Sequence, residues 1–170
     1  MLFLLLVDYT NKFTLFSFKT GQVIPNSDSA TTKWDVGFRS TIIIVNGGTS
    51  GPGSTTAQVI TGTLDGLTEA PVDGYKTDNK SGATTAERNA IPATSGGGWY
   101  NYVQSTNVVS PIAGRVIVVR TSDGRYAKFE ILNYYKGAPT TPSPEPMGTD
   151  KDRYYKFRYV YQPNDTRSFQ

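Results

Sequence analysis

Short apolar segments alternate along the chain with clusters of turn-forming residues. Each segment is rich in β-branched and aromatic residues and is bounded by Gly, Pro, Asn, Asp or Ser, which is typical of β-strands. The expected strands are 13–18, 33–38, 41–45, 57–64, 99–103, 115–121, 126–134 and 153–161. A single short polar stretch, 84–90, could form a helical turn, and no window has a sustained helical period. The pattern therefore predicts an all-β protein with antiparallel sheets.

Three of these segments alternate strictly between apolar and polar residues, which predicts strands with one buried face. They are 34–39, 127–131 and 155–161. The runs 41–45 and 116–119 are continuously apolar, so we expect both of their faces to be covered. Asp35 and Glu130 occupy polar positions of alternating strands and are expected to face solvent. A carboxylate-dependent hydrolase would need such a pair to meet, and nothing in the sequence brings these two together.

The connections between the expected strands include one tight turn and three long loops. Asp123-Gly124 joins two strong strand segments and predicts a β-hairpin. The long loops are 46–56, 79–98 and 136–150. The last has four prolines between 139 and 146, so we expect an extended, exposed excursion. No repeat or interdomain linker is evident, and 1–170 is interpreted as one domain.

The chain contains neither histidine nor cysteine among its 170 residues. This composition excludes Ser-His-Asp and Cys-His catalysis, Cys/His zinc sites and disulfides, and it removes two common haem ligands. Carboxylate chemistry, tyrosine or methionine ligation, and binding without catalysis are still open. We therefore expect a binding protein and no enzyme.

Charge and hydropathy exclude two further classes. The net charge is only +3, from 17 basic and 14 acidic residues, which is far from the basic patches of nucleic-acid-binding proteins. The opening MLFLLLV is too short to span a membrane and lacks the charged start and cleavage site of a signal peptide. The segment has the length of one β-strand. It could be the start of the protein or an interior strand of a longer chain.

A candidate ligand site lies in GGGWYNYVQ, residues 96–104. Three glycines lead into a strand carrying Trp99, Tyr100 and Tyr102, and these rings could form one wall of a flat apolar site with Gln104 at its mouth. A core strand following a loop would have the same sequence. Met147 lies in the proline-rich loop, where a thioether has no packing role, and it is either a candidate haem-iron ligand or, more commonly for such a position, an ordinary surface methionine.

Two other motifs are better explained by structure than by ligand binding. The glycines of 46–53 resemble a phosphate loop, but no lysine follows and the next segment is a strand, so a structural loop is favoured. The aromatic and basic residues of 153–161 resemble those of glycan- or oligonucleotide-binding sheets. Their period of two favours a strand packing one aromatic face onto a core.

The order of several blocks resembles the HmuY-like proteins of Bacteroidetes. The blocks are LFSFKTGQVI, KWDVGFRSTIIIVNGGTSGPG, EAPVDGY, SGGGWYNY and RVIVVRTSDGRYAKFEILNYY, followed by the last aromatic strand. Together they extend over residues 13–161. The resemblance implies one all-β domain likened to a grasping hand, exported by a lipoprotein or secretory signal to an extracellular or outer-membrane-associated location.

The same resemblance implies a haemophore that serves iron acquisition by passing haem to a TonB-dependent outer-membrane receptor. Two histidines ligate the iron in the best-known members, and some relatives use methionines. In this chain Gln104 occupies the position of one of the two iron ligands. The other ligand would come from the shortened segment 76–98, which contains neither histidine nor methionine.

Two hypotheses follow from this comparison. In the first, the chain binds haem or a related porphyrin without the two histidines, through Met147, Tyr100 or Tyr102, or through apolar and arginine contacts alone. In the second, the fold is retained as a surface-interaction or carbohydrate-binding module that does not bind haem.

Overall fold

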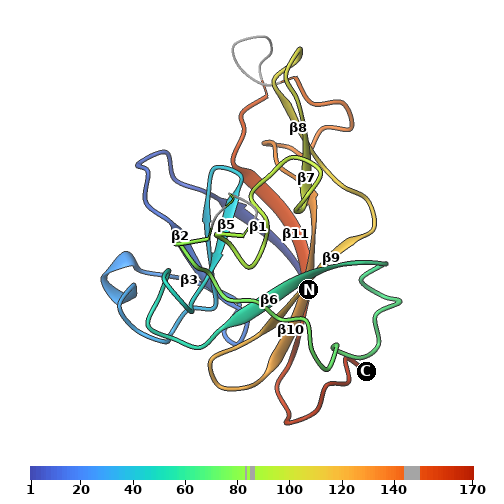
Figure 1. The fold of residues 1–170 in the computed structure, drawn as a ribbon. Helices are drawn as coiled ribbons and strands as arrows, with labels where there is room; N and C mark the ends of the chain where they lie inside the picture. The colour runs from blue at the N-terminus through green and yellow to red at the C-terminus, as the bar shows by residue number, and fades with distance from the viewer. Residues whose placement is uncertain (83, 85–86, 144–149) are drawn as a thin grey trace.

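The computed structural model describes residues 1–82, 84, 87–143 and 150–170, and these residues form eleven β-strands and a single 3₁₀ turn at Asn26–Asp28 (Figure 1). The strands are β1 (Leu2–Leu6), β2 (Thr14–Ser17), β3 (Gln22–Ile24), β4 (Val36–Arg39), β5 (Ile42–Val45), β6 (Thr56–Thr61), β7 (Tyr100–Val103), β8 (Val108–Pro111), β9 (Arg115–Arg120), β10 (Tyr126–Asn133) and β11 (Tyr154–Gln162). The all-β prediction is confirmed. The described part of 84–90 contains no helix.

All strand pairs are antiparallel and belong to three sheets. A five-stranded sheet has the order β1-β11-β10-β9-β6, a four-stranded sheet has the order β3-β2-β4-β5, and β7 pairs with β8 alone. The expected hairpin joins β9 to β10, and Gly124 supplies a positive φ of 78° in its turn. The short strands β3 and β8 were not expected from the sequence.

The two larger sheets pack face to face around an aromatic core. Phe157 of β11 lies 5.7 Å from Phe38 of β4 and 5.5 Å from Phe16 of β2, measured between ring centroids. Tyr155 and Tyr159 point into the same core, so the alternation in β11 is explained by packing, as the sequence favoured. Aromatic contacts of this kind join the sheets across their whole interface.

Parts of the outer faces of the two larger sheets are also covered, around Leu64 on one sheet and around Trp34 and Ile44 on the other, which explains the continuously apolar strands. In β9, Ile117 and Val119 face the central core, whereas Val116 and Val118 face a smaller cluster with Leu64. This smaller cluster also contains Phe169, near the carboxyl end of the chain. Loops therefore form a second layer over part of the five-stranded sheet.

One expectation about solvent-facing residues is wrong. Asp35 is buried, and its carboxylate accepts a hydrogen bond from the Phe18 backbone N–H at 2.8 Å. Glu130 is only partly exposed and forms an ion pair with Arg158 of β11.

The alternating pattern correctly directs Val36 and Phe38 of β4 into the core. It is wrong for Trp34, which precedes β4 and packs in a separate cluster with Leu15 and Ile44.

The glycine loop 46–53 is structural, as the sequence favoured. Gly48 has a φ of 61°, and a Cβ atom there would lie 2.0 Å from the backbone oxygen of Asp78. The Asp78 side chain accepts hydrogen bonds from the N–H groups of Val45 (3.0 Å) and Ala90 (2.8 Å). Glycine therefore allows the loop to pack directly on the segment around Asp78.

Candidate functional site

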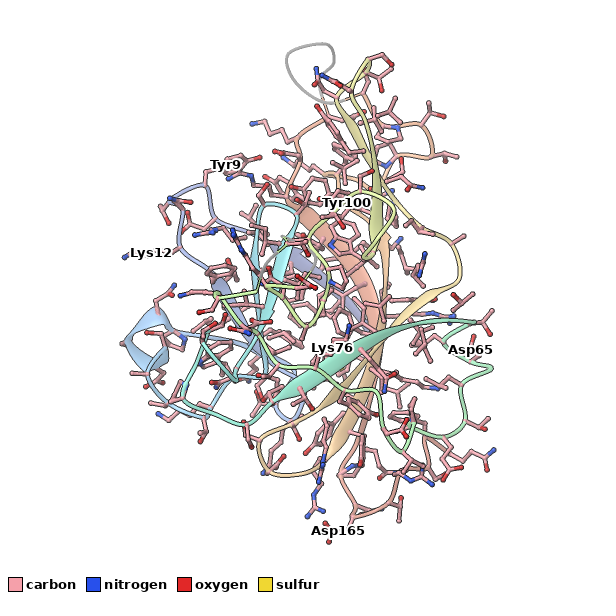
Figure 2. All side chains as sticks on the ribbon, in the orientation of Figure 1. Tyr9, Lys12, Asp65, Lys76, Tyr100 and Asp165 are labelled. Atoms are coloured by element: carbon pink, nitrogen blue, oxygen red, sulfur yellow. The ribbon has the colours of Figure 1, made fainter. Side chains whose placement is uncertain are left out.

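The β7–β8 hairpin projects at one end of the molecule, at the opposite end from the carboxyl-terminal segment (Figure 1). Figure 2 shows Tyr100 beneath this hairpin and Asp165 at the far end. A cavity of about 570 Å³ lies at the hairpin. Its lining residues are Ser40, Thr41, Ala93, Thr94, Ser95, Tyr100, Tyr102, Asn107, Val109, Tyr134, Tyr135 and Asp152. This volume is within the usual range of small-molecule sites, about 300–1,000 Å³.

Trp99 anchors the hairpin to the core and does not line the cavity. Its indole N–H donates to the Thr41 backbone oxygen at 2.9 Å. Its ring packs within 5.2 Å of Tyr155 and 5.7 Å of Tyr134, measured between centroids. The glycines before it let the chain approach closely, since a Cβ at Gly98 would lie 1.9 Å from the Pro92 oxygen. Trp99 therefore fixes where the next residues of β7 lie.

Tyr100 and Tyr102 both line the cavity from β7 and differ in exposure. Tyr100 is buried, and its hydroxyl donates to the Ala93 backbone oxygen at 3.2 Å. Tyr102 is 43% exposed, and its hydroxyl donates to the Asn107 side-chain oxygen at 2.8 Å. Tyr102 therefore presents the more accessible phenol of the two.

Gln104 lies in the turn between β7 and β8, is exposed, and is not among the lining residues. Met147 lies outside the described residues. Of the five site residues expected from the sequence, the structure therefore brings two, Tyr100 and Tyr102, to one cavity.

Tyr134 and Tyr135, which were not expected from the sequence, also line the cavity. Neighbouring residues of a regular strand point to opposite faces, yet both of these rings are buried. A register shift between Ile131 and Asn133 ends the regular pairing, and the Asn133 side chain accepts both following N–H groups at 2.9 Å. The adjacent tyrosines at the end of an expected strand were the only available signal.

Burial favours the neutral form of these two phenols. It raises the pKa of both Tyr134 and Tyr135 above the ordinary value for a phenol. The Tyr135 hydroxyl accepts the Val109 N–H at 2.8 Å, so its own proton is available for donation to a ligand. The lining of the cavity thus combines aromatic rings with a small number of polar groups, as ligand sites commonly do.

One acidic side chain, Asp152, lies at the cavity, where the Tyr9 hydroxyl donates to its carboxylate at 2.6 Å. No cluster of three or more acidic side chains able to hold a metal ion occurs within the described residues. The described lining therefore offers one carboxylate and several phenol oxygens, and no complete metal site. In the described part, no helix is long and apolar enough to cross a membrane.

Two carboxylates do share a hollow elsewhere, of about 470 Å³, but both are already engaged. Asp35 accepts the Phe18 N–H, whereas Asp123 accepts from the Thr121 hydroxyl and pairs with Lys19 at 3.3 Å. These contacts secure the β9–β10 turn against the other sheet. Their role is therefore structural.

The sequence and the fold were compared with known proteins. The family described as HmuY protein matches residues 9–159. No curated protein sequence matches the chain.

Among solved structures, the apo HmuY analogue of Tannerella forsythia is similar, with a TM-score of 0.60, 18% identity and coverage of 96% of each chain. A candidate lipoprotein from Bacteroides fragilis has a TM-score of 0.57 and 16% identity, with coverage of 95% of this chain and 91% of that one. A candidate HmuY-like haem-binding protein from Bacteroides vulgatus has a TM-score of 0.56 and 15% identity, with coverage of 94% and 91%. At these identities the likeness establishes the fold.

Proposed function

Because the chain belongs to the HmuY family, we propose that it binds haem or a related porphyrin in the tyrosine-lined cavity beneath the β7–β8 hairpin. The observation that carries the proposal is that four tyrosine side chains line one cavity. Tyr100 and Tyr102 come from β7, whereas Tyr134 and Tyr135 directly follow β10. Aromatic rings of this kind can pack against the flat face of a tetrapyrrole.

The residues present fit the porphyrin ring better than they fit the iron of a six-coordinate haem. Histidine is absent from the chain, and the candidate axial ligands are the phenols of Tyr100 and Tyr102 and the thioether of Met147. Tyr102 is the favoured phenol, because Tyr134 and Tyr135 are buried with raised pKa values that oppose phenolate formation. Met147 is the candidate thioether. A bound haem would supply the iron, and these residues would hold and orient it.

The cavity carries a carboxylate, so a bound haem is expected to keep its propionates away from Asp152 and toward solvent. We further propose export to the cell surface and delivery of haem to a TonB-dependent outer-membrane receptor. The similar protein from Bacteroides fragilis, a candidate lipoprotein, supports export.

Titration with haemin and with iron-free protoporphyrin tests the two parts of the proposal separately. We expect saturable binding of both, seen as Soret shifts and tyrosine fluorescence quenching at micromolar protein. Tyr102→Phe keeps the ring and removes the phenol oxygen, so it should weaken haemin about tenfold or more and leave protoporphyrin unchanged. Met147→Leu tests the thioether in the same way.

Tyr126→Phe is the matched control, because this tyrosine packs in the smaller cluster on the outer face of the five-stranded sheet. It should bind both porphyrins as the unaltered protein does. If neither porphyrin gives a saturable signal, under oxidising or reducing conditions, the proposal is wrong.

A carbohydrate-binding function is the alternative that the same cavity supports. The exposed ring of Tyr102 lies beside the polar side chains of Ser95, Asn107 and Asp152, which could donate to or accept from sugar hydroxyls. A glycan array with Tyr102→Ala as the negative variant distinguishes the two functions. Glycan binding without a porphyrin signal would favour this alternative.

A further inference from the structure

Strand β1 forms an open edge of the five-stranded sheet, because β11 is the only described strand that pairs with it. The Tyr159 N–H donates to the Met1 oxygen at 2.8 Å, and the Val7 N–H donates to the Arg153 oxygen at 2.8 Å. In an antiparallel strand, alternate residues direct both backbone groups to the same side. The odd-numbered residues of β1 therefore bond to β11, and the even-numbered residues direct their N–H and C=O groups to the open edge.

The even-numbered residues are Leu2, Leu4 and Leu6, which we call the leucine row. Their side chains lie on the outer face of the sheet and are 58%, 73% and 53% exposed. Phe3 and Leu5 point inward to the core. The same three residues thus carry free backbone groups and exposed apolar side chains.

Other strand edges of the two large sheets are covered or short. At β6, Ala57 exchanges two backbone hydrogen bonds of 2.8 Å with Lys76. At β5, the Asp78 carboxylate accepts the Val45 N–H. Strand β3 has only three residues. Strand β1 has five residues and carries no charge, proline or bulge, which are the usual means of preventing edge-to-edge pairing.

We propose that β1 is the interface of a homodimer, in which the β1 strands of two copies pair antiparallel about a two-fold axis at Leu4. Leu4 then faces Leu4 of the second copy, and Leu2 faces Leu6. Every pair in this register joins residues whose backbone groups are free, so all of these groups become hydrogen-bonded. The leucine rows of both copies meet on one face, and the two five-stranded sheets become one continuous sheet.

A second copy fits this edge because the strand is self-complementary in charge and in pattern. The Met1 ammonium donates to the Tyr159 oxygen, on the β11 side, and the nearest cationic side chains in the register, Lys156 and Arg158, lie on β11. The two β11 strands would be three strand spacings apart, roughly 14 Å, which exceeds the Debye length of about 8 Å at physiological salt. The paired strands bury less than the roughly 1,600 Å² of a standard interface, so we expect a weak dimer that forms at micromolar concentrations and resists salt.

Cysteine cross-linking tests the register directly, because the chain has no cysteine of its own. In Leu4→Cys the two Cα atoms would lie about 5.5 Å apart, within disulfide range. In Leu2→Cys or Leu6→Cys alone, the Cα atoms of the two introduced cysteines would lie roughly 14 Å apart, which is too far for a disulfide. Under mild oxidation we expect a disulfide dimer from Leu4→Cys, none from either of the others, and a heterodimer when those two variants are mixed.

Sedimentation tests the association itself. The unaltered protein should be in monomer–dimer equilibrium, whereas Leu4→Lys, a change at an exposed side chain, should be monomeric with an unchanged circular dichroism spectrum. Val23→Lys is the control, since Val23 is 48% exposed on β3 of the other sheet, and it should dimerise normally. An unaltered protein that is monomeric up to submillimolar concentration, or equal cross-linking of all three cysteine variants, would overturn the proposal.

Discussion

The Asp35 carboxylate accepts the backbone N–H of Phe18 at 2.8 Å and joins two positions 17 residues apart in the chain. Burial raises the pKa of Asp35 to about 6, and the negative charge of Asp123 acts in the same direction, whereas the Phe18 hydrogen bond opposes it. The charged carboxylate is therefore less stable in the folded protein than in the unfolded chain. It is retained because it satisfies a backbone donor at the start of the β2–β3 turn.

This shift predicts a specific pH dependence of stability. The unfolded chain loses the Asp35 proton near pH 3.8, whereas the folded protein retains it to about pH 6. Stability arising from this group therefore falls as the pH rises from about 4 to 6, by about 3 kcal/mol. Asp35→Asn should raise the free energy of unfolding at pH 7.5 by up to that amount and change it little at pH 4, as measured by urea denaturation.

Asp73→Asn, at an exposed loop position, is the control for Asp35→Asn and should have little effect at either pH. An Asp35→Asn variant that is less stable than the unaltered protein at pH 7.5 would contradict the assignment. An equal effect at both pH values would do so too.

A second buried carboxylate, Asp78, connects the end of β5 to the loop that contains Ala90. It accepts the N–H groups of Val45 and Ala90, and its side chain is almost entirely buried. Asp78→Ala leaves two buried donors without partners, so we expect a loss of about 2–5 kcal/mol in the free energy of unfolding. Urea denaturation measures it, with Asp73→Ala as the exposed control. A loss below about 1 kcal/mol would mean that water replaces the carboxylate.

Two glycines with positive φ allow backbone strain to be separated from steric conflict. A Cβ atom at Gly124 would meet nothing within 4 Å, whereas the same atom at Gly48 would collide with the Asp78 oxygen. Gly124→Ala should therefore cost about 1–2 kcal/mol from the backbone conformation alone. Gly48→Ala should cost distinctly more, and thermal denaturation of the two variants compares them. Equal losses would show that the loop at Gly48 can move aside.

The sequence predicts the fold well where a strand has one buried face, and less well elsewhere. Alternation identifies β4, β10 and β11, because their inward residues meet a single core. It misses β8, which is four residues long and exists by pairing with β7. It also misplaces Asp35, because the Phe18 N–H that its carboxylate accepts lies 17 residues away and is brought near by the pairing of β2 with β4.

Of the four tyrosines that line the cavity, only the two on β7 could be predicted from the sequence. Tyr100 and Tyr102 follow from the local pattern of β7, since they are two residues apart on one strand. Tyr134 and Tyr135 depend on the irregular end of β10, and Asp152 depends on the return of the chain to β11. Such placement arises from register and loop geometry, which periodicity does not encode.

The last prediction concerns Lys128, a buried lysine on the outer face of β10. Its Nζ donates to the backbone oxygens of Leu64 at 2.6 Å and Leu67 at 2.7 Å, and it lies 4.9 Å from the Phe169 ring centroid. Burial lowers the pKa of this amine. The ammonium group thus connects the loop after β6 and the carboxyl-terminal segment to the sheet.

Lys128→Met keeps most of the apolar stem and removes the ammonium group. We expect a small change in global stability, because relief of the desolvation cost offsets the lost hydrogen bonds. Locally, the loop and the terminal segment should open more often. Hydrogen exchange should accelerate about tenfold at the amides of Ala70 and Phe169, which bond to Arg167 and Thr68, and should be unchanged within β9. Lys156→Met, on β11 of the same sheet, should leave both amides as protected as before; equal acceleration in the two variants would refute a specific role for Lys128.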